Sequence, residues 1–338
     1  MATMKELELE STMGGQGREQ ARDIPVIDLS DFENRREEIT HALWQAATEV
    51  GFFQLANHGI PIAELHQAFD LSQAFFSLPE SEKRKFALQK GQNVGWEFKS
   101  QVRPSTHTPD QKESFQVTLS RMQGYWPDQL VLPEFQRVML DFEYKAWALG
   151  MQVLSCFATR IGFDKEFFTR AHDRSSPEYQ STLRLIHYLP VNEEIAKDPT
   201  LWRAGAHTDF DCLTMVFQRE GQGGLQVCPG NDADANGEGP AWTSVAAHDD
   251  LITCNIGDML MRWSDDKLKS TLHRVRMPAP EDATKPRFST VFFCQANRDQ
   301  IVQGPEHKYE PITAADYLQQ RIEANYGKKQ GQKIAASL

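Results

Sequence analysis

The sequence has few cysteines, and their arrangement excludes two kinds of site. Five cysteines occur in 338 residues, at positions Cys156, Cys212, Cys228, Cys254 and Cys294. The number is odd and no two of them form a CxxC pair, so neither a disulfide framework nor a cysteine-rich zinc site is supported. Cys254 and Cys294 lie within apolar runs, which is typical of buried, reduced thiols.

Long apolar runs and an excess of positive charge are also lacking. No run approaches the roughly 20 apolar residues that a membrane helix needs, and the polar, acidic N-terminus does not look like a secretory signal. The 36 basic and 47 acidic side chains give a net charge of −11. This balance argues against nucleic-acid and anionic-membrane partners. We therefore expect a cytoplasmic monomer whose partner is a small molecule.

Composition and periodicity divide the chain into four parts. Residues 1–22 are polar and have no periodicity, which predicts a disordered tail. An N-terminal α/β region is expected at 23–125, packed on the core and irregular from about residue 87 onward. A β-rich domain is expected at 126–300. A helix with a frayed tail, at 301–338, closes the chain.

One long helix and a series of short strands are predicted for the β-rich part. From Pro133 to Ile161 the apolar residues keep a spacing near 3.6, which indicates an amphipathic helix that backs a sheet. The short β-rich runs that follow are Leu183 to Tyr188, Leu213 to Phe217, Leu225 to Val227, Trp242 to Val245, Ile252 to Asn255, Met259 to Trp263, Thr271 to Val275 and Phe288 to Cys294. Eight short strands favour a sandwich or barrel, and a jelly roll has that number. The predicted fold is mixed and mainly β, a jelly-roll core flanked by helices.

The segment Ala206-His207-Thr208-Asp209 carries the most informative motif. If residues 206–210 form a strand, His207 and Asp209 point to the same face. A later strand near His273 can add a third ligand. Two imidazoles and one carboxylate leave coordination positions open, which suits a non-haem Fe(II) that activates oxygen. Structural zinc prefers a closed tetrahedral shell, usually with cysteines.

Arg287 and Ser289 form a second motif further along the chain. A guanidinium can bind a carboxylate through two parallel hydrogen bonds. A hydroxyl two residues along the same strand faces the same way. The pair therefore indicates a site for a carboxylate.

With these motifs the chain resembles the Fe(II)- and 2-oxoglutarate-dependent dioxygenases of the isopenicillin N synthase type. The similar segments are Ile24-Pro25-Val26-Ile27-Asp28, Gly51-Phe52-Phe53-Gln54-Leu55-Ala56-Asn57-His58-Gly59, Lys112-Glu113-Ser114-Phe115, His207-Thr208-Asp209, Asn255-Ile256-Gly257-Asp258-Met259, Ser270-Thr271-Leu272-His273-Arg274-Val275 and Arg287-Phe288-Ser289. An HxD motif alone is weak. An HxD motif followed along the chain by an HRV motif and then an RxS motif is a much more specific indication of this family.

The resemblance implies a fold, a chemistry and a set of roles. The fold is a double-stranded β-helix, another name for the jelly roll, whose open mouth holds the iron. The chemistry uses O2 and 2-oxoglutarate to oxidise a C–H bond of a small molecule in specialised metabolism, by hydroxylation, desaturation, cyclisation or rearrangement, and releases succinate and CO2. The implied metal ligands are His207, Asp209 and His273, and the implied partners of the far 2-oxoglutarate carboxylate are Arg287, Ser289 and Tyr188.

The walls of a substrate pocket are less well indicated. Phe293 lies six residues after Arg287, an even separation, so it should face the same interior. The resemblance suggests an aromatic substrate wall there. Further candidates for the pocket are Phe210, Arg103, Trp96 and Phe115, and Arg103 could meet a carboxylate of the substrate.

Three alternatives stay open at this point. In some relatives the enzyme oxidises its substrate without 2-oxoglutarate, and there Arg287 and Ser289 meet a substrate carboxylate instead. A non-catalytic jelly-roll protein could bind a small ligand or a metal. A zinc hydrolase is disfavoured because no obvious general base accompanies the three ligands.

Overall fold

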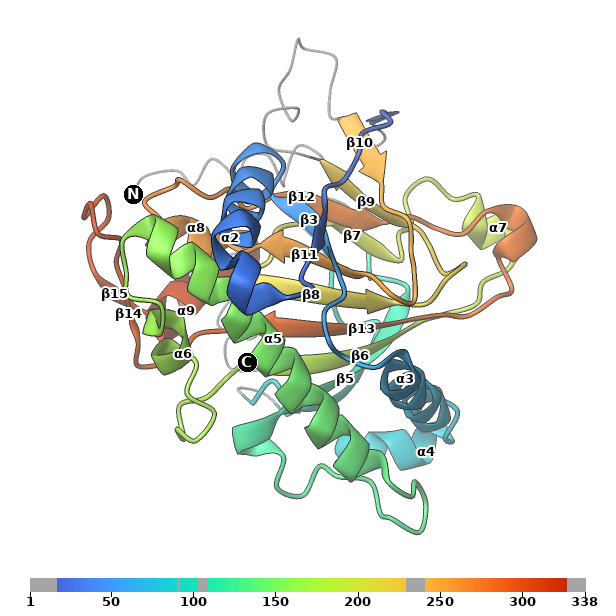
Figure 1. Ribbon diagram of the computed structural model, residues 1–338. Coiled ribbons are helices and arrows are strands. Elements are labelled where there is room, and N and C mark those ends of the chain that lie inside the picture. The colour runs from blue at the N-terminus through green and yellow to red at the C-terminus, as the bar shows by residue number, and fades with distance from the viewer. Residues whose placement is uncertain (1–16, 90–91, 103–107, 229–240, 327–338) are drawn as a thin grey trace.

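Two β-sheets form the centre of the protein (Figure 1). The computed structural model describes residues 17–89, 92–102, 108–228 and 241–326. Within them the larger sheet has the strand order β2-β3-β11-β8-β13-β6-β5-β4, the smaller has the order β1-β10-β9-β12-β7, and β14 and β15 form a separate pair.

The elements have the following bounds. The strands are β1 Arg18–Glu19, β2 Val26–Asp28, β3 Phe52–Ala56, β4 Gly95–Phe98, β5 Lys112–Thr118, β6 Thr182–Tyr188, β7 Ala204–His207, β8 Leu213–Gln218, β9 Leu225–Cys228, β10 Ala241–Ser244, β11 Ile252–Ile256, β12 Leu272–Val275, β13 Arg287–Cys294, β14 Ile301–Val302 and β15 Ile312–Thr313. The α-helices are α2 Phe32–Glu49, α3 Ile62–Phe76, α4 Glu80–Lys83, α5 Phe135–Ile161, α6 Phe167–Ala171, α7 Glu193–Ala196, α8 Asp258–Trp263 and α9 Ala314–Tyr326. Short 3-10 helices are η1 Arg84–Phe86, η2 Leu119–Arg121 and η4 Pro280–Asp282.

Apolar side chains join the inner faces of the two sheets. Ile186 of β6 and Val291 of β13 belong to one buried cluster with Leu225 and Val227 of β9 and Val275 of β12. Each strand contributes alternate residues to this interior because side chains of a strand point to opposite faces in turn. Two facing sheets packed in this way are the jelly roll that the sequence predicts, and this prediction is confirmed.

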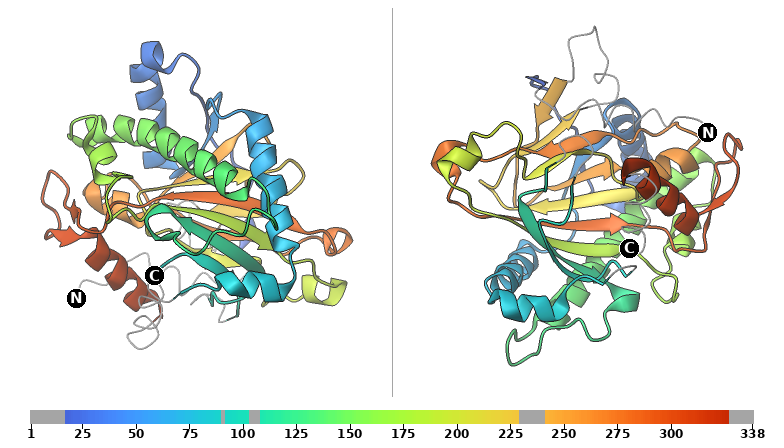
Figure 2. Two further views of the ribbon diagram at one scale, coloured as in Figure 1. Left: turned by 90° about the horizontal axis from the view of Figure 1, so that it is seen from below. Right: turned by 180° about the vertical axis from the view of Figure 1, so that it is seen from behind.

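Helices α2, α3 and α5 cover the outer face of the larger sheet (Figure 1 and Figure 2). The long helix α5 runs across it, and the ring of Phe142 lies 4.9 Å from that of Phe217 in β8. The helix has 27 residues and ends at Gly162, whose φ of 116° lies in a region that glycine adopts without strain. One long helix backing a sheet is confirmed.

Strands from the N-terminal part of the chain lie at both edges of the larger sheet. β2 and β3 extend it next to β11, and β5 and β4 extend it next to β6. The stretch from residue 87 to 125, which the sequence led us to expect as irregular, therefore contains two strands. β5 is hard to recognise because Lys112, Ser114 and Gln116 place polar side chains on its inner face, although every residue of the strand is buried.

Three further local predictions are wrong. Residues 258–263 form the helix α8 rather than a strand, because a short apolar run fits either element equally well. β7 ends at His207, so Asp209 follows the strand instead of lying in it. Residues 18 and 19 of the expected tail pair with β10, while residues 1–16 lie outside the described part of the chain.

Two predictions from composition can be compared with the structure. Cys254 and Cys294 are buried thiols, as expected, and the other three cysteines are buried thiols as well. Among the described residues, no helix combines the length and the apolar character that crossing a bilayer requires.

Candidate metal centre

Two strands of the smaller sheet bring the predicted metal ligands together. His207 at the end of β7 pairs directly with His273 in β12, and the two imidazole rings lie 4.3 Å apart. Asp209 follows β7, with Oδ1 3.8 Å from Nε2 of His207 and Oδ2 3.5 Å from Nε2 of His273. One ligand atom from each of the three residues lies within 4.8 Å of the others. The three side chains therefore converge on one point.

Backbone carbonyl groups fix which nitrogen each histidine offers. Nδ1 of His207 lies 2.7 Å from the carbonyl oxygen of Gly205, and Nδ1 of His273 lies 3.2 Å from that of Thr271. A carbonyl oxygen only accepts hydrogen bonds, so both Nδ1 atoms carry the proton. The lone pair is then on Nε2, the atom that faces Asp209 and can bind a metal.

Two polar side chains of the larger sheet orient the Asp209 carboxylate. Thr214 Oγ1 donates to Oδ2 over 2.7 Å, and Asn255 Nδ2 donates to the same oxygen over 2.9 Å. Thr214 in β8 and Asn255 in β11 are paired across the strands. Sequence reasoning placed Asn255 in a strand but missed both roles. One signal could have indicated these roles, because Thr214 and Asn255 are polar residues within two otherwise largely apolar strand segments.

A second carboxylate lies beside the ligands. Asp211 is buried, and its Oδ2 atom lies 3.1 Å from Thr214 Oγ1, whose proton is directed at Asp209 over the shorter distance. Burial, together with the negative charge of Asp209, holds the pKa of Asp211 well above its ordinary value. Asp211 is not part of the group of three ligand atoms that converge on one point.

The carboxylate-binding motif lies at one end of the larger sheet. Arg287 and Ser289 of β13 are 2% and 1% exposed, and Arg287 pairs across the strands with Tyr188 of β6. Nε of Arg287 donates to the carbonyl oxygen of Gln222 over 2.8 Å, and its Cζ lies 4.5 Å from the centre of the Tyr188 ring. Among the described residues, Nη1 of Arg287 and Oγ of Ser289 have no hydrogen-bond partner. Apart from the neighbouring hydroxyl of Tyr188, nothing in the described part of the chain offers these two buried donors an acceptor.

Gln218 adds a further unpaired polar group on the same face. It pairs with Ser289 across β8 and β13, and its position two and four residues after Val216 and Thr214 places it on the face that meets Asp209. Neither side-chain amide atom of Gln218 has a partner in the described part of the chain. Buried polar groups without partners are costly. The interior between the three ligands and Arg287 therefore fits a polar occupant.

Positive charge surrounds this end of the interior. Burial would raise the pKa of Tyr188, but the charges of Arg287 and Lys112 outweigh it and lower the pKa. Burial, with the charge of Arg287 in addition, lowers the pKa of Arg203 to about 10. Lys112 is paired with Asp110 at 3.0 Å. The field of these cations favours an anion beside Arg287.

Comparisons with known proteins agree with this geometry. Residues 24–130 match the family described as non-haem dioxygenase in morphine synthesis N-terminal, and residues 179–296 match the 2OG-Fe(II) oxygenase superfamily. Proline hydroxylase buaE of Petromyces alliaceus is 32% identical over 90% of this chain and 100% of the relative. The chain belongs to the 2OG-Fe(II) oxygenase superfamily. The 2-oxoglutarate-Fe(II) type oxidoreductase ppzD of Metarhizium rileyi is 30% identical over 90% of this chain and 92% of the relative.

Solved structures share the fold. A full-length Neurospora crassa protein, solved in complex with alpha-KG and 5-formyluracil, has a TM-score of 0.76 and 32% identity, over 88% of this chain and 95% of that protein. The same Neurospora crassa protein in complex with alpha-KG and thymine has a TM-score of 0.76 and 29% identity, over 93% of this chain and 97% of that protein. The isopenicillin N synthase type of oxygenase, inferred from the motifs, is confirmed.

The residues present fit the Fe(II) and 2-oxoglutarate that members of this superfamily use. Two imidazole nitrogens and one carboxylate oxygen on one side of a metal are the ligand set typical of non-haem Fe(II) oxygenases. Nη1 of Arg287 and Oγ of Ser289 need acceptors, and a carboxylate of 2-oxoglutarate has two acceptor oxygens.

The predicted pocket residues divide into two groups. Phe293 of β13 is partly exposed on the same face as Arg287, and its ring centre lies 5.0 Å from Cζ of Arg184. Phe210 is partly exposed directly after Asp209. Both positions are consistent with a pocket wall. Arg103 lies outside the described residues.

Phe115 and Trp96 lie in the hydrophobic core, not in the pocket where we expected them. Phe115 is fully buried on the outer face of β5, and its ring lies 4.4 Å from that of Phe75 in α3. Trp96 pairs with Phe115 across β4 and β5, and its Nε1 donates to Glu113 over 2.7 Å. The period of two in β5 puts Ser114 and Gln116 on the inner face and Phe115 on the other.

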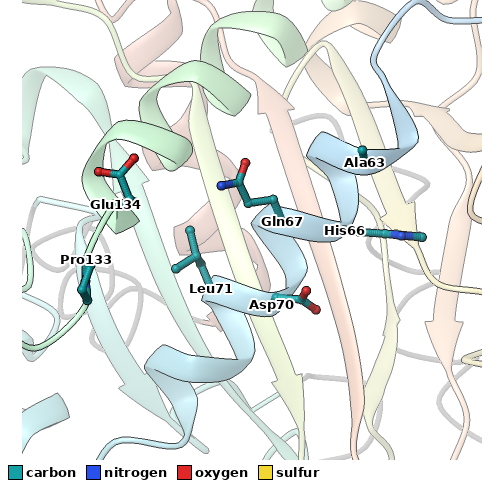
Figure 3. Close-up of a pocket in the computed structure, with 7 residues that line it drawn as sticks. All are labelled: Ala63, His66, Gln67, Asp70, Leu71, Pro133 and Glu134. Atoms are coloured by element: carbon teal, nitrogen blue, oxygen red, sulfur yellow. The ribbon is translucent and has the colours of Figure 1, made fainter.

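A surface groove elsewhere contains none of these residues. It has a volume of about 610 Å³ and lies between α3 and the start of α5, lined by Ala63, His66, Gln67, Asp70, Leu71, Pro133 and Glu134 (Figure 3). His66 points out of it toward Asp249, at 3.2 Å. The groove is therefore separate from the metal centre.

Proposed function

We propose that His207, Asp209 and His273 hold the Fe(II), and that Arg287 and Ser289 bind the far carboxylate of 2-oxoglutarate. The observation that carries this proposal is the pair of buried donors without partners, Nη1 of Arg287 and Oγ of Ser289. They lie on the face of the larger sheet that also presents Thr214 to Asp209. A dicarboxylate bound between the two groups supplies the missing acceptors.

The bound iron and 2-oxoglutarate supply the oxidant that removes hydrogen from a substrate carbon, with succinate and CO2 as the coproducts. The contribution of the protein is position and environment. Thr214 and Asn255 keep the Asp209 carboxylate in one orientation. Tyr188 and the apolar cluster around Ile186 and Val291 exclude water from the same interior.

The substrate is a small molecule that meets Phe293 and Phe210. Phe293 offers an aromatic face beside the Arg184 guanidinium, so a compact molecule with a polar group suits this wall. Named relatives differ in what they bind, since one is a proline hydroxylase and the Neurospora crassa protein has been solved with thymine. The fungal relatives support a role in specialised metabolism. The net charge of −11 disfavours nucleic-acid and anionic-membrane partners, and we infer a cytoplasmic protein with a monomer as the default state.

Oxygen-dependent release of succinate tests this function. Protein supplied anaerobically with Fe(II) and 2-oxoglutarate should develop a visible absorption band. On admission of O2 it should release succinate, slowly alone and faster with an accepted substrate from a panel that includes proline and pyrimidine bases. Asp209→Ala should do neither. Substrate oxidation without 2-oxoglutarate would contradict the proposal, as would a folded protein that shows neither the band nor succinate.

A further inference from the structure

The C-terminal helix α9 contributes one buried arginine to the centre of the protein. Arg321 is 1% exposed, and its Nη2 atom lies 2.5 Å from Oδ2 of Asp258, which is fully buried. Asp258 is the first residue of α8. The ion pair thus joins α9 to α8 at the end of the sheets where both helices lie (Figure 2).

The same two side chains contact the segment between the metal ligands. Arg321 Nη2 donates to Thr208 Oγ1 over 3.2 Å, and Thr208 Oγ1 donates to Asp258 Oδ2 over 3.1 Å. The backbone N–H of Asp258 donates to the carbonyl oxygen of Asp209 over 2.8 Å. Thr208 and Asp209 are therefore tied to α8 by side chain and by backbone.

Two aromatic residues complete this connection. Cζ of Arg321 lies 5.4 Å from the ring centre of Phe210, the residue after Asp209. The hydroxyl of Tyr317, one turn earlier in α9, donates to the carbonyl oxygen of Asp258 over 3.2 Å. Because β7 ends at His207, Asp209 lies outside the strand ladder. The contacts from α8 and α9 hold the backbone where the ladder does not.

We propose that Arg321 is a positioning residue for the metal, acting through Asp258 and Thr208 on the backbone that presents His207 and Asp209. The inference rests on the proposed metal site. A buried ion pair often adds little net stability. The pair of Arg321 and Asp258 lies between α9 and the segment that carries the ligands, which favours a role in positioning that segment. Fixing the ligands before the metal arrives raises affinity, and losing groups that orient ligands typically lowers affinity roughly 10- to 100-fold.

Binding of Mn(II) to metal-free protein tests this role without any turnover. The dissociation constant is measured from the electron paramagnetic resonance signal of unbound Mn(II). Arg321→Met should raise it about tenfold or more. Arg321→Lys keeps a charge opposite Asp258 but not the planar group beside Phe210, so it should weaken Mn(II) binding less than Arg321→Met does.

A matched variant separates positioning from general support of the fold. Arg174 forms a comparable pair with the fully buried Glu143 of α5, with Nη2 2.5 Å from Oε2, and neither residue contacts the ligand segment in the described part of the chain. Arg174→Met should lower the melting temperature and leave the Mn(II) dissociation constant unchanged. If Arg321→Met behaves in the same way, Arg321 only supports the fold and the proposal is overturned.

A milder variant keeps the test valid if Arg321→Met does not fold. Thr208→Val preserves the size of the side chain and removes only the hydroxyl that links Asp258 and Arg321. It should weaken Mn(II) binding several-fold, and an unchanged dissociation constant would overturn the proposal. Failure of the unaltered protein to bind Mn(II) would instead reject the metal site itself, so the two failures are distinguishable.

Discussion

Single residues show most clearly which parts of the site can be predicted from sequence. His207, Asp209 and Arg287 belong to short motifs whose members lie two residues apart, so local spacing alone indicates them. Thr214 and Asn255 act on Asp209 from strands that only the fold brings together. No local pattern marks such residues. Gln218 is hidden for the same reason, as the last polar residue of an otherwise apolar strand.

Removal of the Arg287 guanidinium should weaken binding of 2-oxoglutarate with little effect on the metal. Loss of one partner of a buried charge pair costs about 2 kcal/mol or more, which corresponds to roughly a 30-fold rise in the dissociation constant. The measurement is an anaerobic titration of the Arg287→Ala variant with 2-oxoglutarate, followed by the visible absorption band. Mn(II) affinity serves as the control. An unchanged 2-oxoglutarate affinity would show that the carboxylate lies elsewhere.

Ionised Glu113 should stabilise the folded protein, and this contribution should be lost as the pH falls. Oε1 lies 2.8 Å from Nδ1 of His187 and Oε2 lies 2.8 Å from Nζ of Lys83. Burial would raise the pKa of Glu113, but the hydrogen bonds from His187, Lys83 and Trp96 outweigh it and lower the pKa below its ordinary 4.5. A lowered pKa contributes stability above pH 4.5, and this stability is lost as the pH falls toward the folded-state value.

The Glu113→Gln variant isolates this contribution. Urea unfolding should show a larger loss of stability relative to the unaltered protein at about pH 6 than at about pH 4. Asp164→Asn is a suitable comparison, since the pKa of Asp164 is also lowered but its pair with Arg170 is exposed. An equal loss at both pH values for Glu113→Gln would mean that its charge is not linked to folding.

At the scale of elements, a helix or strand was predicted correctly where its own sequence carries a long, regular apolar pattern. Helix α5 and strand β13 carry long apolar patterns that fit only one kind of element. β5 carries polar residues toward the site and apolar residues toward the core, and α8 has only six residues. β5 is buried on both faces and α8 is short, so neither sequence has a local pattern that identifies the element.

The close approach of α5 to β13 gives a prediction at the scale of elements. A Cβ atom at Gly150 would lie 2.5 Å from Sγ of Cys294. Gly150→Ala should therefore cost about 1–2 kcal/mol in the free energy of unfolding, since overpacking outweighs the better helix propensity of alanine.

A compensating change tests the cause. Cys294→Ala frees the space that the added methyl group needs, so the double variant should be more stable than the sum of the two single changes predicts. Chemical denaturation of the four proteins gives this coupling energy. Additivity within about 0.5 kcal/mol would show that Gly150 and Cys294 do not compete for the same space.

For the whole molecule, ligands that bind only the folded state should stabilise it. Mn(II) and 2-oxoglutarate at about 100 times their dissociation constants should each add about 2.7 kcal/mol, which raises the melting temperature by several degrees. The melting temperature is measured by following the fluorescence of the protein during heating. Asp209→Ala should lose the response to Mn(II), whereas Arg287→Ala should keep it and lose most of the response to 2-oxoglutarate. Identical melting with and without both ligands would contradict the site as a whole.

The sheet order has a consequence for how the protein is made. β2 to β5 are translated before the middle strands β6, β8, β11 and β13, yet they belong at the two edges of the same sheet. The nascent chain must hold these early strands with open edges until the centre is synthesised, a state prone to aggregation. His207 and Asp209 have no third ligand until residue 273 is translated, and α9 follows later still. Loading of the complete metal site therefore has to wait until β12, which carries His273, has been translated.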